Sequence, residues 1–386
     1  MKGSGPLACV IGDMDMVRPL GLAGVRVVAA GWTGPETRWS RYTVDHIELP
    51  DLWEEGAATV AALVRFARRQ EERPVLFYQN DPSVLLISRH RQELADHFAF
   101  VVPDADLVLD LVDKARFTEL ALRHNLPIPR TALTRGGESN PNLADLSYPV
   151  IVKPVLRKDT TETWNPVAGS AKARSAGSAA ELAALLSRHE LEGVPLVVQE
   201  AIPGPEDRIS SYHAFIDEAG TTRGEFTGRK FRTWPGQFGQ STAVEIVAQD
   251  DVRALGREIL HKLEFTGVAK VDFKRDDDGH LLLFEINPRF SLWHHPGAVA
   301  GVNIPALVYR SLTGSAVSAS EARSGICWCN LWNDWRAARA QGVGPIEWLR
   351  FAAAADARRA AHLDDPGSTV GALAYVLRDK RRESKR

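Results

Sequence analysis

Short apolar runs alternate with helical patterns along the first hundred residues of the chain. Runs at 7–12, 25–30, 75–78 and 98–102 are rich in β-branched and aromatic residues, which predicts four buried strands. The segment 54–69 spaces its apolar residues at helical intervals, as an amphipathic helix does. Strands and helices in this order predict an α/β unit with a parallel sheet.

Gly12 and Asp13 follow the first predicted strand. The G-x-G-x-x-G fingerprint is absent there, so the pattern does not favour a dinucleotide site. Ligands of parallel sheets commonly bind at the carboxyl ends of strands. The two residues therefore either contact a substrate or only form the turn.

The middle of the chain has a different pattern. A helix is predicted at 113–124, and apolar runs predict strands at 149–154 and 195–200. The first of these strands contains Lys153, which calls either for a bound anion or for an exposed sheet edge. The polar loop 157–178 between the strands could cradle phosphates with its backbone N–H groups, although most such loops are plain connections.

The segment LLLFEINPRF ends an apolar run with polar side chains. Successive side chains of a strand point to opposite faces of the sheet. Glu285 and Asn287 are therefore expected on one face, with Phe284 and Ile286 on the other. The preceding sequence, GVAKVDFKRDDDGH, alternates in the same way, so the two runs together predict a β-hairpin.

The Asp-Gly dipeptide at 278–279 is a strong signal for a two-residue turn in this hairpin. With the turn at that position, Asp272 lies opposite Glu285. Lys270 then lies opposite Asn287. Directly opposed side chains have their Cβ atoms roughly 4.5–5.5 Å apart, so the two carboxylates would repel each other.

A divalent cation removes this conflict. Mg²⁺ binds oxygen ligands and completes its coordination with water and substrate phosphates. Asp272, Glu285 and the side-chain carbonyl of Asn287 supply such oxygens from one sheet face. Lys270 and Arg289 bracket them with positive charge suited to phosphate oxygens. A solvated surface hairpin with scattered charges is the alternative interpretation.

Composition narrows the range of functions. The 386 residues, with 44% hydrophobic and 25% charged content, suffice for two or three ordinary cores. The formal net charge of −2 excludes a global basic excess of the kind that attracts nucleic acid, so an anionic ligand needs a local basic site. The three cysteines fit neither a disulfide framework nor a zinc site. Because there is no signal peptide and no long apolar run, we expect a cytoplasmic protein without a membrane partner.

Several motifs together resemble a known family. DKARF, YPVIVKP, VVQEAIPGPEDR, GRKFRTWPGQFG, VAKVDF and LFEINPRF occur in the order found in the ATP-grasp superfamily of carboxylate–amine ligases. The likeness is strongest to the carboligase-like branch that includes D-aspartate ligase, and it extends over most of the chain. It implies an α/β protein, α+β in the catalytic part, in which an ATP-grasp fold follows an N-terminal parallel α/β domain. The implied domains are a pre-ATP-grasp domain at 1–110, a small lobe at 111–195, a large lobe with the metal site at 196–315 and a C-terminal tail region at 316–386.

The resemblance also implies roles for individual residues. Those implied for ATP are Lys114, Lys153 and Lys230 at the phosphates, Gln199, Glu200 and Ile202 at adenine, and either Glu206 or Asp207 at the ribose. Asp272, Glu285 and Asn287 match the family's Mg²⁺ ligands, with Mn²⁺ as the substitute metal. Lys270, Arg289 and Lys230 match the cations beside the reacting groups. Two departures from the family are that GSAKARSAGS has few consecutive glycines and that Lys270 stands where arginine is common.

The implied activity is that of an ATP-dependent ligase. A substrate carboxylate becomes an acyl phosphate, an amine then forms an amide, and ADP and phosphate are released. Ser291, His294 and His295 follow the metal strand and are expected on the acceptor side, with Arg232 assisting nearby. Either histidine could act as a general base or only hydrogen bond within the fold. The loop 157–178 is the candidate lid.

Two other functions stay open from the sequence. One is a carboxylase-like ATP-grasp enzyme that activates bicarbonate, and the other is a non-catalytic ATP-binding sensor. The partners expected are small carboxylates and amines, and a homodimer is expected from the family alone. The sequence does not identify either substrate.

Overall fold

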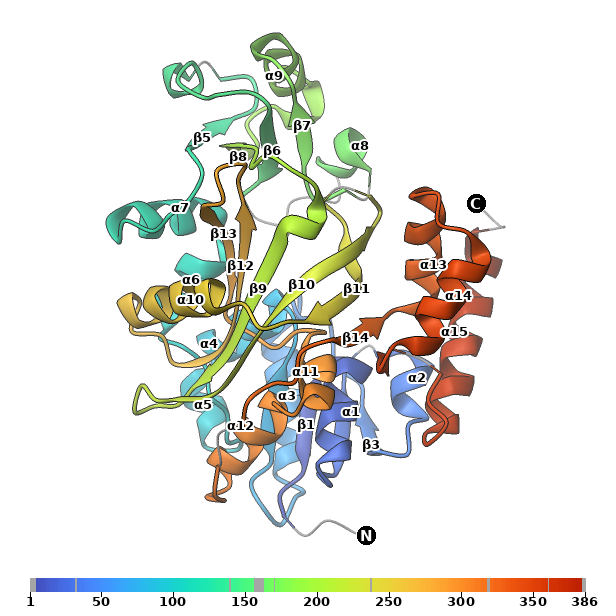
Figure 1. Ribbon diagram of the computed structural model, residues 1–386. Coiled ribbons are helices and arrows are strands. Elements are labelled where there is room, and N and C mark those ends of the chain that lie inside the picture. Colours follow the sequence, from blue (N-terminus) through green and yellow to red (C-terminus); the bar gives the residue numbers. More distant parts are fainter. Residues whose placement is uncertain are drawn as a thin grey trace.

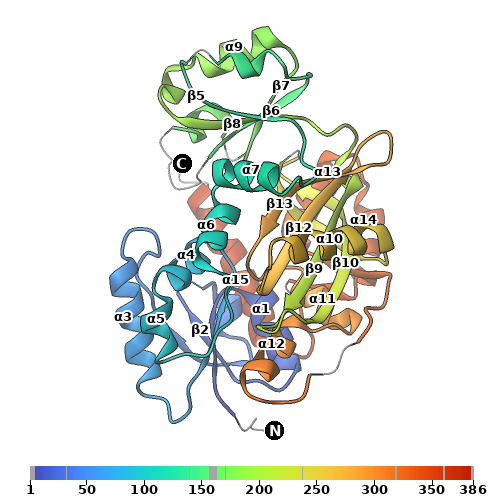
Figure 2. The same cartoon turned by 90° about the vertical axis from the view of Figure 1, so that its left-hand side faces the viewer.

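Three β-sheets organise the chain. The computed structural model describes residues 5–383 except 32, 139, 156–162, 170, 237, 318–319 and 360, and it describes side chains up to residue 375. Figure 1 shows a small sheet standing apart at the top, a large sheet in the middle and the N-terminal sheet below it. Figure 2 shows the same separation after a quarter turn. The mixed α/β fold with a parallel N-terminal sheet agrees with the sequence pattern.

The N-terminal sheet has four parallel strands in the order β3-β2-β1-β4. The strands are β1 (Ala8–Ile11), β2 (Val27–Ala30), β3 (Thr43–Ile47) and β4 (Val75–Tyr78), and the helices are α1 (Met14–Leu22), α2 (Pro35–Arg38), α3 (Gly56–Ala67), α4 (Asp81–Arg89) and α5 (Arg91–Ala95). Strand β3 escaped sequence analysis because it is a polar, largely exposed edge strand. The strand predicted at 98–102 is reduced to a single bridge between Val75 and Ala99.

The small sheet is antiparallel, with the strand order β5-β8-β6-β7. Its strands are β5 (Thr131–Arg135), β6 (Val150–Pro154), β7 (Arg174–Ala176) and β8 (Pro195–Glu200), and the nearby helices are α6 (Ala105–Val112), α7 (Lys114–Arg123), α8 (Asn165–Ala168) and α9 (Ala179–Leu186). Leu182 and Leu186 of α9 share a buried core with Val150, Val152 and Val198 of the sheet. Because β8 pairs with both β5 and β6, this sheet extends to residue 200.

The large sheet has seven strands in the order β13-β12-β9-β10-β11-β14-β15. Its strands are β9 (Ile209–Ile216), β10 (Thr222–Trp234), β11 (Gln240–Ile246), β12 (Gly267–Arg275), β13 (Leu281–Asn287), β14 (Ile326–Cys329) and β15 (Ala357–Arg358). One face packs against α7 and α10 (Asp250–Lys262). The other face joins the core of the N-terminal sheet together with α11 (His294–Ala300) and α12 (Ile304–Leu312).

The hairpin β12–β13 has the predicted pairing at its functional end. Asp272 pairs with Glu285, and Lys270 pairs with Asn287. The turn itself differs from the prediction, because Asp276 pairs with His280 across a three-residue loop. A β-bulge then adds Phe284 to β13, between the pairs formed by Asp272 and Phe273, and this extra residue restores the predicted register.

The C-terminal region adds strands to the large sheet and packs a helix against the N-terminal part. Strands β14 and β15 extend the large sheet beside β11, and the helices are α13 (Leu331–Ala340), α14 (Pro345–Ala354) and α15 (Pro366–Glu383). Helix α13 packs on β10 and β11, and α15 packs on α2 of the N-terminal part. In Figure 1 these red helices lie at the right of the large sheet, and Figure 2 shows α15 apart from α13 and α14.

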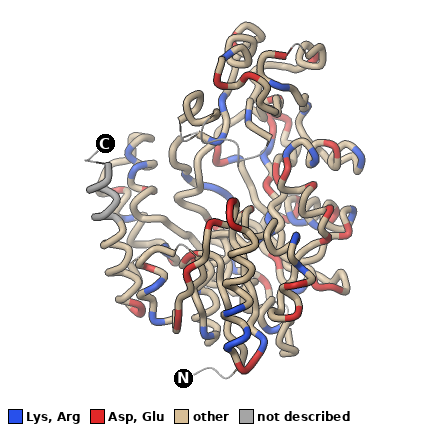
Figure 3. Tube along the Cα trace, turned by 180° about the vertical axis from the view of Figure 1, so that it is seen from behind, with Lys and Arg blue, Asp and Glu red and all other residues tan. Residues whose placement is uncertain are grey.

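Charges are distributed over the whole trace. Figure 3 shows basic and acidic residues interspersed on every part of the molecule. Among the described residues, no helix combines the length and hydrophobicity that crossing a bilayer would require.

Asp365 connects the C-terminal helices to the N-terminal part, and we expect it to matter for stability. It is fully buried, and it accepts hydrogen bonds from the Ser40 hydroxyl (2.5 Å) and the Arg41 backbone N–H (2.9 Å). Asp365→Ala leaves these donors unsatisfied, which should lower the free energy of unfolding by about 1–3 kcal/mol. Urea denaturation measures the change, with the exposed Glu218→Ala as control. Equal stability of the two variants would contradict the assigned contact.

Candidate functional site

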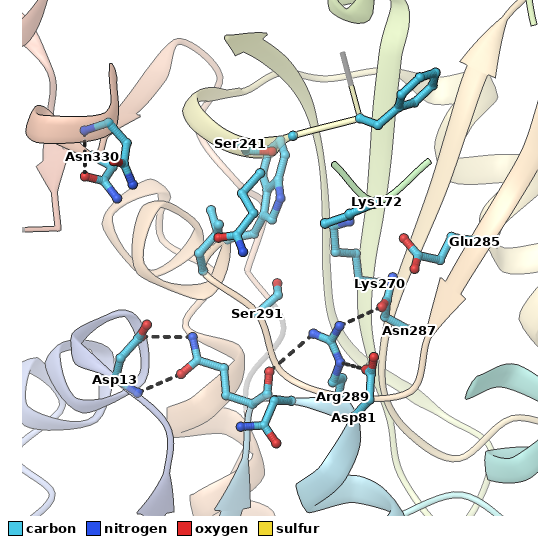
Figure 4. Close-up of a pocket in the computed structure, with 18 of the residues that line it drawn as sticks. Asp13, Asp81, Lys172, Ser241, Lys270, Glu285, Asn287, Arg289, Ser291 and Asn330 are labelled. Carbon is cyan, nitrogen blue, oxygen red and sulfur yellow. Dashed lines mark hydrogen bonds and ion pairs between the residues drawn. The ribbon is translucent and has the colours of Figure 1, made fainter. Parts of the chain in front are cut away.

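A cavity of about 2220 Å³ lies where the small sheet, the large sheet, the N-terminal strand ends and the C-terminal helices meet. Most residues singled out from the sequence line it. These are Lys114, Lys153, Gln199, Glu200, Ile202, Glu206, Lys230, Lys270, Asp272, Glu285, Asn287, Arg289 and Ser291. Figure 4 shows side chains from the N-terminal part, the hairpin and the C-terminal helices facing one another across this space.

Two carboxylates and one amide of the β12–β13 hairpin line the cavity together. Asp272 is 1% exposed, accepts a hydrogen bond from the Ser211 hydroxyl and forms an ion pair with Lys270. Glu285, directly opposite on β13, faces the open cavity (Figure 4). The Asn287 side-chain carbonyl accepts a hydrogen bond from Arg289 at 2.9 Å. The hairpin therefore places the side-chain oxygens of these three residues on one sheet face.

Neighbouring cations keep these carboxylates ionised. Burial raises the pKa of Asp272, but Lys270 and then Lys230 lower it more, and the net shift is downward. Burial raises the pKa of Glu285, but the charges of Lys270, Lys172 and Arg289 together lower it more, so the net shift is again downward. Burial lowers the pKa of Lys270, and Asp272 counteracts this shift. The cluster is thus a compact set of alternating charges.

The bulge at Phe284 changes the composition of the cavity wall. Simple alternation predicts that this ring faces away from Glu285, yet Phe284 lines the cavity. The extra residue in β13 turns the ring to the same side, where the Lys230 Nζ lies 5.9 Å from its centroid. The sequence interpretation of this position was wrong for that local reason.

Two lysines reach the cavity from the small-sheet side. The Lys114 Nζ donates to the Val155 carbonyl at 3.1 Å. The Lys153 Nζ donates to the Gln199 Oε1 at 3.2 Å. Burial and then the nearby Lys114 charge lower the pKa of Lys153 to about 8. Lys153 therefore does not occupy a free sheet edge, and its charge is available to an anion in the cavity.

The loop after β8 is held by a lysine that the sequence analysis did not single out. Lys274 donates from Nζ to the carbonyls of Ile202 (2.9 Å) and Gly204 (2.6 Å). It follows Asp272 by two positions on the same strand, so its place on the cavity face was recoverable from alternation. Of the two acids left unresolved by the motif, Glu206 lines the cavity and Asp207 is absent from the lining.

Arg232 does not take part in the cavity wall, contrary to expectation. A β-bulge between Lys230 and Arg232 turns its side chain to the opposite face. There it binds the fully buried Asp334 through Nε (2.8 Å) and Nη2 (2.7 Å). Its charge is used to attach α13 to the sheet.

His294 and His295 also lie outside the cavity lining, which corrects their expected place on the acceptor side. Both are at most 2% exposed, and burial lowers the pKa of each to about 3. The ring of His294 packs edge-on against His213 and Phe290. The structure therefore does not support a general-base role for either ring. Hydrogen bonding within the fold is not seen for His294 either, because its two ring nitrogens have no hydrogen-bond partner among the described residues. Of the three residues expected on the acceptor side in this segment, only Ser291 lines the cavity.

Only part of the candidate lid lies among the described residues. Residues 157–162 and 170 of the 157–178 loop lie outside the described residues. Lys172, which follows them, lines the cavity close to Lys270 and Glu285 in Figure 4.

The carboxyl ends of β1 and β4 contribute residues to the cavity, and the sequence analysis had not singled out all of them. The Gln79 amide donates to the Asp13 carboxylate at 3.0 Å, and the Asp13 backbone N–H donates back at 2.8 Å. Arg359, from the far end of the chain, binds the same carboxylate at 2.8 Å. Asp81 forms an ion pair with Arg289. Asp13 also caps α1 by accepting from the Asp15 backbone N–H at 3.0 Å, so it forms the turn, and its contact with a substrate stays a prediction. Nothing local in the sequence points to Arg359.

Comparison of sequences gives two relevant matches. A family model described as "ATP-grasp in the biosynthetic pathway with Ter operon" matches residues 215–329. D-aspartate ligase of Enterococcus faecium (strain Aus0004) is 26% identical over 267 residues, which cover 66% of this chain and 62% of the relative. The match thus spans less than two thirds of the relative's length.

Comparison of structures adds the fold. An ADP complex of N5-carboxyaminoimidazole ribonucleotide synthetase matches with a TM-score of 0.64 and 14% identity, covering 86% of this chain and 82% of that one. Biotin carboxylase of Campylobacter jejuni gives 0.62 and 13%, with 83% and 74% covered. L-amino acid ligase of Bacillus licheniformis gives 0.59 and 15%, with 85% and 79% covered. The resemblance to the ATP-grasp superfamily inferred from the motifs is confirmed.

The lowered pKa of Lys153 predicts a pH-dependent affinity for phosphate groups. The ammonium is charged below about pH 8 and neutral above it, so ADP binding should weaken as the pH rises from 7 to 9. Lys153→Arg should remove most of this dependence, because arginine stays charged throughout. Titration calorimetry at several pH values measures the effect, with Lys262→Arg on α10 as control. An unchanged pH profile in Lys153→Arg would rule out this role.

Proposed function

Because the chain has the ATP-grasp fold, we propose that it is an ATP-dependent carboxylate–amine ligase. The enzyme would use Mg-ATP to convert a substrate carboxylate into an acyl phosphate. An amine would then displace the phosphate and form an amide bond. The products would be the amide, ADP and inorganic phosphate.

One observation carries this proposal. A cluster of side-chain oxygens stands between lysines from two different sheets, all facing one cavity. Phosphoryl transfer needs little covalent help from the protein and depends on positioning and on stabilising the charge of the transferred group. A structural hairpin gains nothing from opposed carboxylates. The 26% identity to D-aspartate ligase supports the ligase assignment.

The oxygen cluster fits a divalent cation. Asp272, Glu285 and Asn287 are hard oxygen donors at adjacent positions of two paired strands, which is the ligand chemistry of Mg²⁺ and Mn²⁺. The three residues would hold the ion, and the ion would supply charge neutralisation for the phosphate oxygens. Lys270 and Arg289, which now contact Asp272 and Asn287, would be available to the substrate oxygens.

ATP would span the junction of the small and large sheets. Lys114, Lys153 and Lys230 would contact its phosphates. The segment Gln199–Ile202 would hold adenine with backbone and side-chain groups, while Lys274 keeps the following loop in place. We assign the ribose contact to Glu206, because it lines the cavity and its neighbour does not.

The reacting carboxylate would lie beside Arg289 and Lys270. Their charges would orient it for in-line attack on the γ-phosphorus. They would then stabilise the oxyanion that forms when the amine attacks the acyl phosphate. Arg289 is itself oriented by Asp81 and by the Gln79 carbonyl (3.3 Å), so the N-terminal part would position the chemistry without taking part in it.

A bicarbonate-activating enzyme is the rival function, since N5-carboxyaminoimidazole ribonucleotide synthetase and biotin carboxylase have the same fold. Their identities of 14% and 13% indicate fold alone, whereas the sequence match is to a ligase. A bound ATP without turnover would instead indicate a sensor.

Phosphate release from Mg-ATP tests the proposal. The protein is incubated with pooled carboxylates and amines, and separately with bicarbonate. Release that requires both a carboxylate and an amine, with an amide found by mass spectrometry, is the expected result. Release with bicarbonate alone, or ATP binding with no release from any pool, would refute the ligase assignment.

Glu285→Gln should abolish turnover without unfolding the protein. The substitution removes charge from the metal-facing carboxylate but keeps its volume. We expect kcat to fall by about 100-fold or more, by analogy with the loss of other charge-stabilising groups. ADP affinity in EDTA should stay unchanged, and Glu258→Gln on the exposed side of α10 serves as control. Normal activity of Glu285→Gln would show that the metal assignment is wrong.

A further inference from the structure

The cavity is larger than a nucleotide and a small amino acid require. Its volume of about 2220 Å³ compares with roughly 300–1,000 Å³ for pockets that bind drug-sized ligands. The expected nucleotide contacts all lie on the small-sheet and hairpin side. The remaining space extends past Ser291 toward the C-terminal helices, as Figure 4 shows from Ser291 to Ser241 and Asn330.

An apolar wall bounds this remaining space. We call it the tail wall, and it has two parts, which are Trp335, Trp348 and Leu349 from α13 and α14, and Val370, Leu373 and Tyr375 from α15. Leu349, Val370 and Leu373 are 58%, 57% and 60% exposed, so they are large apolar side chains left open inside a cavity. Several exposed apolar residues that line one cavity point to a binding surface, whereas single ones need no explanation.

The tail wall is attached firmly to the rest of the cavity. Helix α15 lies so close to α2 that a Cβ on Gly371 would come within 2.5 Å of the Pro35 backbone. The Trp348 Nε1 donates to Asp334 at 3.0 Å, and its ring packs against Trp335 with centroids 5.1 Å apart. The polar atom of Trp348 is therefore satisfied away from the cavity, and its apolar surface is left for contact.

Two arginines near the tail wall are already engaged. Arg359 is bound to Asp13 at 2.8 Å. The Arg336 guanidinium lies over the Trp332 ring, 5.1 Å from its centroid. None of the six residues of the tail wall is charged. A ligand group in this space would therefore meet mainly apolar and aromatic surface, in contrast to the cationic nucleotide side.

We propose that the tail wall binds an uncharged apolar group, at least as large as a leucine or phenylalanine side chain, on one of the two ligase substrates. This assignment rests on the proposed function and adds the substrate class. The carboxylate or amine would react beside Arg289, and the apolar group would extend past Ser291 onto α14 and α15.

Kinetics with matched substrates test the proposal. Leucine, phenylalanine, glycine and aspartate are supplied in all pairs, since each can serve as carboxylate or amine, and phosphate release is measured. Pairs that contain leucine or phenylalanine should have at least tenfold higher kcat/KM than glycine with aspartate. Equal or lower kcat/KM for the apolar pairs would overturn the proposal.

Variants locate the effect on the tail wall. Leu349→Ser and Leu373→Ser should raise the KM of the apolar substrate about tenfold, with little change in kcat or in the KM of ATP. Ile346→Ser is the matched control, because Ile346 lies on the same helix as Leu349, is 67% exposed and is outside the cavity lining. Identical kinetics of Leu349→Ser, Leu373→Ser and Ile346→Ser would overturn the proposal.

A binding probe separates failure of this inference from failure of the proposed function. The fluorescence of 1-anilinonaphthalene-8-sulfonate reports apolar sites without any turnover. Its affinity should fall several-fold in Leu349→Ser and Leu373→Ser but not in Ile346→Ser. If no substrate pair releases phosphate, the ligase function fails while this result still decides the apolar site. Unchanged probe binding, or a smaller molecular mass of the two variants than of the unmodified protein in light scattering, would overturn the site.

Discussion

Two carboxylates facing each other across a pair of antiparallel strands are the constraint on which the rest of the site depends. Asp272 and Glu285 are fixed opposite each other by the backbone ladder of the hairpin, so neither can move away from its like charge. Lys270 beside Asp272 lowers the pKa of both acids and keeps them ionised in a partly buried place. The cluster by itself contributes little to the stability of the fold, because its charged groups lose hydration when they are buried. Its arrangement makes physical sense as a preorganised receptor for added positive charge and phosphate.

The surrounding architecture supplies each side of that receptor from a different part of the chain. The small sheet contributes Lys153, the large sheet contributes Lys230 and the hairpin, and the N-terminal part orients Arg289 through Asp81. The C-terminal helices close the far side, held by Arg359 and Asp365 on N-terminal partners. A cavity assembled from four parts can combine a polar, cationic half with an apolar half. No single sheet face could offer both, because each is either packed in a core or lined with charge.

Two β-bulges show the limit of predicting the face of a side chain from alternation along a strand. Each extra residue moves the side chains that follow it to the other face. In β13 the bulge at Phe284 compensates for the longer turn, so the pairing of Asp272 with Glu285 was predicted correctly although the turn was not. In β10 a bulge turns Arg232 away from the face of Lys230 and toward Asp334. Both bulges lie beside the site, where such irregularities commonly redirect side chains. A bulge depends on the neighbouring strand, so the period of one strand does not reveal it.

The sequence by itself determined the α/β order of the N-terminal part, the strands with buried apolar runs and the functional pairing in the hairpin. Most of the site residues that it singled out also line the cavity. These features follow from local periodicity and from motifs whose order is specific. Only the tertiary structure decided that β8 lies between β5 and β6 in the small sheet and that His294 and His295 are buried away from the cavity. It alone also decided that Arg359 binds Asp13, 346 positions away in the sequence. It also decided that α14 and α15 leave apolar side chains open to the cavity, since amphipathic periodicity gives a helix an apolar face but not the partner of that face. The physical reason is the same in each case, because burial and long-range pairing depend on which surfaces meet, and this is set by packing of the whole chain.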